Sequence, residues 1–414
     1  ISIIKMELKT KGGVQDLRRL HTKTVIYEDM FQNMLTCDLI LLDTENLLEV
    51  NPIVGDEILT LVWKSSRAPK GHDYPSISLT MNLTGVEQRK VAEGSTKQVY
   101  TLTFVSQVGY KNLHNKLNRS FDDTESNIAQ NVLTNVLGAS KLDIESTKWP
   151  RKIVVPNMRP FEFINYLATG AVRPSGYPAS NYLFWEDRDT HYFKSLDKIM
   201  EGAHALILES VITGHLKWDD EPNFRKQNIS AYRSDNLFND NINTSNGLWA
   251  KEFIGQDIIK KKLTKHKWLY DSEWSASVQI DGSNERLRED YPTDTYISQD
   301  FGAWQEGRPE YNSWKSDDYR KRRKAMLQQF QNYRYICELP GDNNVRVGNK
   351  IKFKLPSQSH RYADMEDKVL NGNWVITRIR HELNQHTHTI TAELRKPHLK
   401  SFGYKEVIEN GDYD

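Results

Sequence analysis

Three observations predict that this chain folds as an α+β protein built mainly from strands. Many short segments alternate apolar and polar residues with the period of two that half-buried strands show. One pattern of three blocks occurs twice, about 300 residues apart. Helical spacing is confined to stretches between the two copies. With 414 residues, 38% of them hydrophobic and 27% charged, the chain is long enough for several ordered domains.

The repeated pattern has the same three blocks in the same order. The first copy consists of Cys37-Asp38-Leu39, the octet Asn51 to Ile58, and Thr101-Leu102-Thr103. The second consists of Cys337-Glu338-Leu339, the octet Asn344 to Ile351, and Thr389-Ile390-Thr391. Asn, Val, Gly and Ile occupy identical places in the two octets. We interpret this as a duplicated β-unit. Two copies of one module can give an assembly a higher pseudo-symmetry than its number of subunits, which favours an assembly part over an enzyme.

The first β-domain is predicted at residues 1–112. Its clearest strands are Leu39–Asp43, Glu57–Trp63, Ser76–Met81 and Gln98–Val105. Short strands joined by turns are typical of a small barrel or sandwich.

An α/β insertion is predicted at residues 113–203. Apolar spacing predicts one helix from Ser126 to Gly138, where glycine is a stop signal, and a second from Pro160 to Ala168. A hairpin follows, with strands at Tyr182–Trp185 and His191–Phe193 joined by the charged turn Glu186–Asp189.

Strands return at residues 204–235. Residues 236–315 are rich in Asn, Asp, Ser and Trp and are predicted to be loop-rich, packing on the chain itself or on a neighbour. A helix is expected from Asp317 to Tyr333, followed by the second copy of the β-unit and a tail at 398–414.

Charge and cysteine content exclude some classes of protein. A net charge of +1 argues against a dedicated nucleic-acid binder. The sequence contains no apolar run long enough to span a membrane and shows no secretory signal pattern at its start, so neither membrane insertion nor secretion is expected. Cys37 and Cys337 begin equivalent strands, and we expect small buried thiols rather than a disulfide.

Two clusters could carry chemistry. His381-Glu382 followed by His386 and His388 resembles a zinc site, but a zincin needs His-Glu-x-x-His on a helix, and residue 385 is Gln. The flanks alternate as strands, so these histidines are expected at a hairpin turn. The turn Glu186–Asp189 with His191 could supply carboxylates for acid–base work, but a charged hairpin tip gives the same residues.

The run Tyr319–Lys324 is the only concentrated basic stretch. It could contact phosphate or an acidic neighbouring subunit. The alternative is a solvated helix face, with Ala325, Met326, Phe330 and Tyr333 turned towards the β-domain. Nucleophile elbows, phosphate-binding glycine loops and Cys-x-x-Cys pairs do not occur in the sequence. We therefore assign no catalytic, cofactor-binding or metal-binding residues and leave the interface residues unassigned.

Several ordered stretches carry a family resemblance. They are Met34–Asp43 with Pro52–Glu57, Pro160–Leu167 with Phe184–Asp187, Tyr319–Lys354, and Trp374–Leu383. With these the chain resembles the central hub protein of contractile-tail baseplates, typified by the T-even bacteriophages. It is more distantly similar to the hub-like part of type VI secretion spike proteins. The matches are short, lie in order over most of the chain, and are poor at 236–315.

The resemblance implies two tube-protein-like β-barrel domains with two inserted α/β or loop-rich domains. The first barrel would be 1–112 and the second 204–235 with 332–397. The insertions would be 113–203 and 236–331, the latter grouped with the tail. The resemblance also implies a non-enzymatic virion protein of the tail baseplate, made in the host cytoplasm and without a cofactor.

The resemblance also implies a set of partners. Three chains would form a homotrimer that joins a sixfold tail tube, or tube-initiator proteins, to a threefold central spike. Baseplate wedge proteins and a tape measure are further expected partners. DNA would pass through the channel without specific binding, so few Lys or Arg are expected on the inward face and the basic helix is expected outside.

Two other functions stay open at this point. A tail-tip cell-wall hydrolase could lie in the Trp-rich segment, with a carboxylate such as Asp271 or Glu273. A carbohydrate- or receptor-binding module at 236–331 would use exposed Trp and Tyr. Neither explains the duplication.

Overall fold

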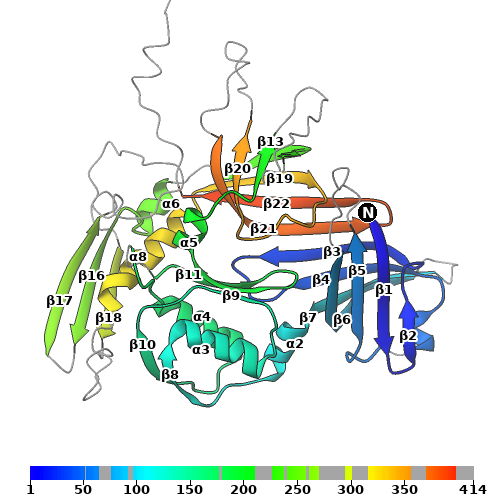
Figure 1. The fold of residues 1–414 in the computed structure, drawn as a ribbon, viewed down its shortest axis with the longest axis horizontal. Coiled ribbons are helices and arrows are strands. Elements are labelled where there is room, and N and C mark those ends of the chain that lie inside the picture. Colours follow the sequence, from blue (N-terminus) through cyan, green and yellow to red (C-terminus); the bar gives the residue numbers. More distant parts are fainter. Residues whose placement is uncertain are drawn as a thin grey trace, which may run out of the picture.

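The computed structural model describes most of the chain (Figure 1). The described residues are 1–51, 53–64, 76–91, 97–176, 180–209, 226–236, 240–257, 261–269, 294–300, 316–355 and 370–397. Its strands are β1 Ser2–Thr10, β2 Gly13–Asp16, β3 His21–Asp29, β4 Thr36–Asp43, β5 Ile58–Lys64, β6 Ile77–Val91, β7 Gln98–Ser106, β8 Ser120–Thr124, β9 Leu142–Ile144, β10 Pro150–Val154, β11 Tyr182–Glu186, β12 His191–Ser195, β13 Leu206–Glu209, β14 Lys226–Asn228, β15 Ala231–Asn236, β16 Ala250–Asp257, β17 Lys262–Leu269, β18 Asp294–Asp300, β19 Tyr333–Pro340, β20 Lys350–Lys354, β21 Gly372–Asn384 and β22 His388–Lys396.

The helices are fewer and lie mostly between the two copies of the β-pattern. They are α1 Leu47–Val50, α2 Gln107–His114, α3 Glu125–Asn131 continued by the π-helix η1 Val132–Val136, α4 Pro160–Gly170, α5 Leu196–Glu201, α6 Asp240–Ser245 and α8 Ser316–Gln329. The mainly β, α+β fold is confirmed. None of the described helices combines the length and apolar character needed to cross a bilayer.

One 14-stranded sheet contains both copies of the repeat. We call the strands in the order β3-β4-β7-β6-β5-β1-β2 the first unit and those in the order β15-β19-β22-β21-β20-β13-β14 the second unit. In each unit the cysteine-bearing strand, β4 or β19, is followed in space by β7-β6-β5 or β22-β21-β20. These neighbours are all antiparallel. The two copies therefore share strand order and direction over these strands. They differ at the next strand, which is antiparallel in the first unit, where β1 pairs with β5, and parallel in the second, where β13 pairs with β20.

The strand register agrees as well. Leu39 lies opposite Leu102 in the first unit, and Leu339 lies opposite Ile390 in the second. Two residues before these leucines, Cys37 lies opposite Phe104 and Cys337 lies opposite Ala392. Each cysteine is free and buried, as expected. Because a slip of one residue would turn every side chain to the other face, equal registers are independent support for a duplication.

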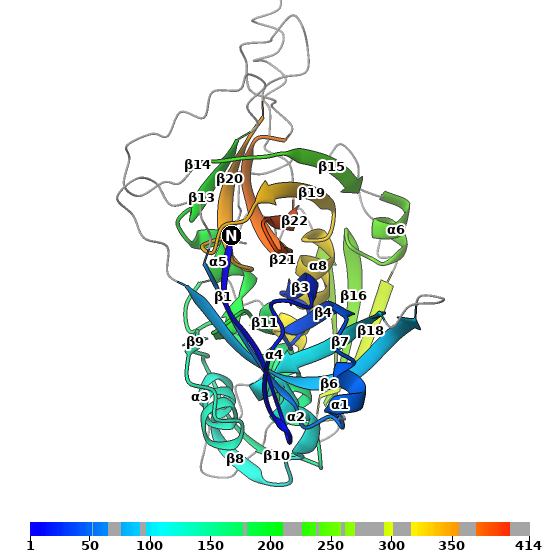
Figure 2. The same cartoon turned by 90° about the vertical axis from the view of Figure 1, so that its right-hand side faces the viewer.

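The described strands do not close into the two barrels that the resemblance implies. Their order is open, ending at β2, β14 and β15, and the two units merge where β3 pairs with β21. Each unit is instead a strongly bent sheet around its own core (Figure 2). The physical reason is that the second half of β21 bonds to the other unit rather than to a strand of its own.

Three large apolar clusters and a small one, formed by Leu248 and Ala325, lie in the described chain. The first unit encloses Met6, Leu39, Trp63 and Phe104 among others. The second unit encloses residues such as Phe353 and Trp374, together with Leu183, Trp185 and Leu196 of the insertion. The third cluster lies within 117–193, between α3, α4, β11 and β12. Burial of one such large side chain contributes about 1.5–3 kcal/mol, so Trp185 binds the insertion firmly to the second unit.

The helices agree with the sequence except at their ends. The helix predicted from Ser126 ends in a π-helical turn before Gly138, whose φ is +73°. The helix before the second copy stops at Gln329, so Tyr333 belongs to β19. The segment expected to be loop-rich contains the three-stranded sheet β17-β16-β18. The strands of this sheet alternate only weakly between apolar and polar residues, so period-two alternation does not mark them in the sequence.

Candidate functional site

The turn between β11 and β12 is the centre of a buried polar network rather than an exposed hairpin tip. Glu186 is 5% exposed, Asp187 0% and Arg188 5%. The hairpin predicted here is confirmed, but its charged turn is buried. The turn lies where the insertion meets both units, and each of its charged side chains has a partner in one of them.

Arg188 joins the first unit to the second. Its Nε lies 2.7 Å from Oε1 of Glu28 on β3, and both side chains are almost completely buried. Its Nη1 and Nη2 donate to the carbonyl oxygens of Asn343 and Val345 at 3.0 and 2.6 Å. Burial opposes ionisation of Glu28, but the charge of Arg188 and a hydrogen bond from His381 outweigh it and lower the pKa of Glu28. The pair is therefore ionised.

Asp187 and Asp189 bind the octet turn of the second unit. Nη1 of Arg346 donates to Oδ2 of Asp187 at 2.8 Å and to Oδ1 of Asp189 at 2.7 Å. Burial and the nearby Glu28 raise the pKa of Asp187, although Arg346 opposes the shift. At Asp189 burial is outweighed by the bonds from Arg346 and Lys141, which lower the pKa.

Glu186 binds the first unit. Its Oε2 accepts from the Leu35 amide at 3.1 Å and from the Ser106 hydroxyl at 2.6 Å. Its Oε1 lies 3.4 Å from Nε2 of His191. One short turn thus connects the insertion to β3, to β7 and to the residue before β4 on one side, and to the octet of the second unit on the other.

Two histidines extend the network along the β21–β22 hairpin, where the sequence places them. Nε2 of His381 lies 3.2 Å from Oε1 of Glu28, and Nδ1 of His381 lies 3.1 Å from Nε2 of His388. With Glu28 ionised, hydrogen bonding assigns the proton of His381 to Nε2, so His388 donates to Nδ1. Burial lowers the pKa of both histidines, and His381 adds to the effect at His388. Both rings are neutral in the folded protein at neutral pH.

The network connects the insertion to both units and offers no metal site. Across the ranges that the structure describes, His, Cys, Asp and Glu side chains form no group of three or more able to hold a metal ion. The charges of Glu28 and Asp187 are matched by Arg188 and Arg346. A buried pair of this kind contributes less to stability than to fixing a geometry, and breaking it is costly. The arrangement can set the relative position of the three parts.

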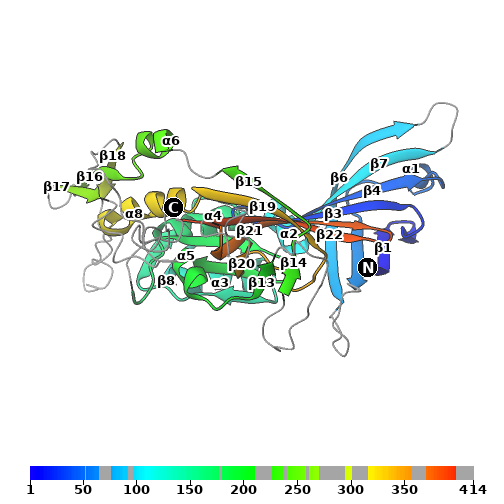
Figure 3. The same ribbon diagram turned by 90° about the horizontal axis from the view of Figure 1, so that it is seen from above.

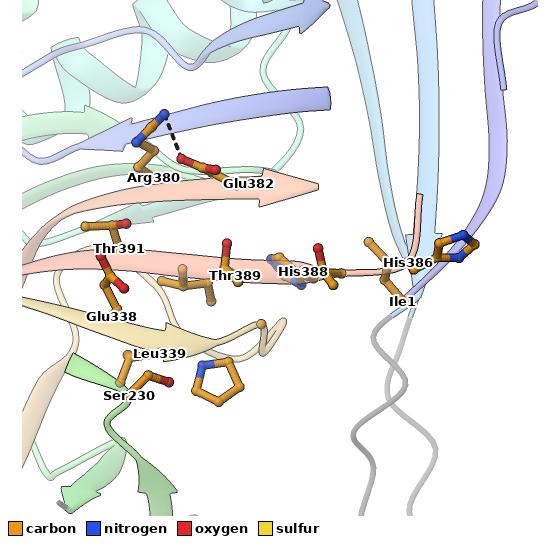
Figure 4. A pocket seen from close by; sticks show the side chains of 14 residues that line it. Ile1, Ser230, Glu338, Leu339, Arg380, Glu382, His386, His388, Thr389 and Thr391 are labelled. Atoms are coloured by element: carbon orange, nitrogen blue, oxygen red, sulfur yellow. Dashed lines mark ion pairs between the residues drawn. The ribbon is translucent and has the colours of Figure 1, made fainter. Parts of the chain in front are cut away.

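A polar pocket of about 540 Å³ lies beside the same hairpin (Figure 4). His386, His388 and the ion pair of Arg380 with Glu382 line it, together with Glu338, and Ile1 lies beside His386 (Figure 4). Hydroxyls of the second repeat's threonines complete the wall. The pocket offers hydrogen-bonding groups, one ion pair and the further carboxylate of Glu338.

The basic helix is only partly a solvated face. Ala325 and Phe330 are buried as expected, but Nη1 of Arg323 donates to the carbonyls of Ala168, Ser180 and Tyr182 at 3.0, 2.8 and 2.9 Å. Burial lowers the pKa of Arg323 to about 10. The prediction of a solvated run is therefore wrong for Arg323, because the last carbonyls of α4 and the start of β11 take its guanidinium.

Some candidate residues lie outside the described chain. Asp271 and Glu273, the carboxylates considered for a hydrolase, are among them, as is the tail 398–414.

Sequence reasoning did not single out Glu28 or Arg346. A signal existed for Arg346, because it replaces the apolar Ile53 of the first octet. Glu28 gave no comparable signal, because its partner Arg188 is distant in the sequence.

The fold and this junction define a class of protein: one chain containing two equivalent sheet units locked together by an insertion. No family model matches the chain, and no curated protein matches it. Two solved structures share its fold. The tail protein from Neisseria meningitidis MC58 aligns with a TM-score of 0.54 at 10% identity, covering 95% of this chain and 96% of that one. The 43 kDa tail protein of prophage MuSo2 from Shewanella oneidensis aligns with a TM-score of 0.52 at 12% identity, covering 95% and 98%.

The chain therefore has the fold of phage-type tail proteins over nearly its whole length. Identities of this size show a shared architecture. The resemblance found in the sequence is confirmed at that level.

Proposed function

We propose that this protein is a structural, non-enzymatic part of a phage-type tail baseplate, in which three copies form a ring that joins a tail tube to a central spike. The observation that carries the proposal is a pair of units in a single sheet whose central strands, β4-β7-β6-β5 and β19-β22-β21-β20, have the same order and direction, with equal registers at β4–β7 and β19–β22. Three chains would present six equivalent units on one side while keeping threefold symmetry on the other. Such a ring adapts a sixfold partner to a threefold one.

The division of the chain follows the same proposal. The first unit, residues 1–112, and the second, residues 204–235 with 332–397, would form the ring as barrel-like modules. The insertions 113–203 and 236–331 would lie at its outside. The packing of Trp185 into the core of the second unit supports this, because the insertion covers the core side of the sheet and leaves the other face bare.

The bare face is our candidate for the channel wall. One row of residues crosses it from β4 to β19: Thr36, Tyr27, Arg380, Thr391 and Glu338, each opposite the next. Two cations on this face, Lys23 and Arg380, share the carboxylate of Glu382 at 2.6 and 2.7 Å. The register puts the further carboxylates of Asp38 and Glu338 on the same face. Paired charges attract phosphate weakly, so tape measure and DNA could pass without specific binding.

Light scattering of the purified chain over a range of concentrations tests the proposal. We expect a mass about three times 48.2 kDa, and negative-stain images should show a closed ring. A chain that stays monomeric at every concentration, both alone and mixed with its spike and tube partners, would contradict the ring.

A further inference from the structure

The junction between the two units shows how one unit binds the next. Strand β21 receives two strands along the same edge: β20 pairs with Gly372–Val375, and β3 pairs with Arg378–Asn384. Strand β3 is the edge of the first unit, so this contact is an edge strand docking on the second half of a long strand.

The first unit contains the same docking edge, and no described strand occupies it. Strand β6 corresponds to β21, and β5 pairs with its first part, Ile77–Asn82. From Leu83 to Val91 the described strands pair with it only on the β7 side. Residues 84 to 91 are exposed except for the half-buried Gly85. The β6–β7 ribbon extends away from the body of the molecule (Figure 3).

The second unit contains the matching strand, β15. Strand β15 corresponds to β3, because Tyr232 lies opposite Cys337 as Ile26 lies opposite Cys37. Among the described strands β15 pairs with β19 alone. Ala231, Arg233 and Ser234 are exposed.

We propose that β15 of one copy pairs antiparallel with the second half of β6 of another copy, repeating between chains the contact that β3 makes with β21 within a chain. An unpaired strand edge is a ready template for another strand, and main-chain hydrogen bonds would supply much of the affinity. The occupant is a second copy because only this chain's own junction supplies the pattern for the contact.

The duplication also fixes the register. Val86 lies opposite Leu102 as His381 lies opposite Ile390, so Val86 takes the place of His381. Since Ile26 lies opposite His381, Tyr232 is expected opposite Val86.

The neighbouring positions follow from the same alignment. Ala231 then lies opposite Glu87, and Arg233 lies opposite Gly85. Arg233 is diagonal to Glu87, so the two exposed charges are complementary, and glycine leaves room for the arginine.

This contact joins different faces of the two copies, so it propagates head to tail until a ring closes. Each chain supplies one β15 and one β6 edge. With three chains the ring holds six units, every one joined to the next by the same kind of strand pair. The inference rests on the proposed ring and adds to it the residues through which the copies meet.

Disulfide trapping of the full chain tests the register. The variant Ala231→Cys/Glu87→Cys places two cysteines directly opposite across the proposed contact, within reach of a disulfide after small adjustments. Under mild oxidation we expect covalent dimers and trimers on a non-reducing gel. Cys37 and Cys337 are buried and free, so they add no background.

Two matched variants make the result decisive. Ala231→Cys/Val86→Cys shifts the register by one residue, which points the thiols to opposite faces, and should give no covalent oligomer. Val25→Cys/Glu382→Cys is the equivalent pair within the chain and should crosslink intramolecularly, which shows that this kind of position can form a disulfide.

The possible failures are distinguishable. A trimer by light scattering that does not crosslink at 231/87, while the 25/382 control does, overturns this register and leaves the proposed ring intact. A chain that neither crosslinks nor associates overturns both. As a second readout, Arg233→Glu should raise the concentration needed for assembly at least tenfold, and Arg233→Glu/Glu87→Arg should restore it.

Discussion

The turn before β5 and the turn before β20 occupy equivalent places in the two units, yet different contacts stabilise them. In the first unit Glu57 closes the turn on itself, accepting from the amides of Val54 and Gly55 at 2.9 and 2.8 Å. In the second unit the equivalent residue is Lys350, whose Nζ donates instead to the carbonyl of Met200 in the insertion.

The rest of the second turn is bound by the insertion as well. Arg346, which replaces Ile53, bonds to Asp187 and Asp189. The two glycines show the same contrast. A Cβ on Gly55 would meet nothing within 4 Å, whereas a Cβ on Gly348 would lie 2.8 Å from the ring of Trp185. The two turns thus share their place in the unit, but only the second is bound by the insertion.

Loss of Arg188 should have the largest effect. Arg188→Ala leaves Glu28 buried and ionised without its partner, so we expect the free energy of unfolding to fall by about 3–5 kcal/mol. Urea unfolding at pH 7.5 measures it. Arg18→Ala, which removes an exposed pair with Asp16 in the first unit, should change little. Equal losses in the two variants would show that the buried network is no more important than a surface pair.

Alanine variants of Gly55 and Gly348 separate the effect of backbone strain from the effect of contact with Trp185. Gly55→Ala should lower the free energy of unfolding by about 1–2 kcal/mol. The only cause there is the backbone strain of a residue with a side chain at a φ of +100°. Gly348→Ala adds overlap with Trp185 and should cost about 2–4 kcal/mol. Chemical denaturation of both variants gives the difference. If the two costs were equal, the insertion would not press on the second turn.

Acid should weaken the hairpin of the second unit. The folded pKa of His388 lies well below its ordinary 6.5 because of burial and the neighbouring His381. Below pH 6.5 the unfolded chain therefore takes up a proton that the folded chain does not. Stability then falls by up to about 1.4 kcal/mol per pH unit for this residue.

His388→Asn removes that titration and should flatten the loss of unfolding free energy between pH 6.5 and 5. His386→Asn, at the exposed end of the same hairpin, serves as the control and should keep the wild-type slope. If the unfolding free energies of the wild type and of both variants fell equally with pH, His388 would be excluded as a source of the pH dependence.

The smallest expected difference is between the two cysteines. Burial raises the pKa of both thiols, to about 12 at Cys337. Neither should react with a thiol reagent at pH 8 until the chain unfolds, and both should then react. Rapid reaction of one thiol in the native protein would show that its unit opens locally, which breaks the equivalence of the two cores.

The sequence by itself determined the repeated unit. The alternation of a strand depends on residues only a few positions apart. The blocks around Cys37 and Cys337 therefore keep a recognisable pattern in the sequence. The helix Pro160 to Ala168 and the hairpin at Tyr182 were predictable for the same reason, since local spacing and turn residues specify them.

Only the tertiary structure decided how the two units are joined. The charged turn Glu186–Asp189 has the composition of a surface loop, and only its position between the units buries it. The merging of β3 with β21, which replaces two closed barrels, depends on hydrogen bonds between strands far apart in the chain. Such contacts leave little trace in local sequence because backbone groups pair alike whatever side chains they carry. Local periodicity therefore specified the two units, and long-range strand pairing and buried charge fixed how they are joined.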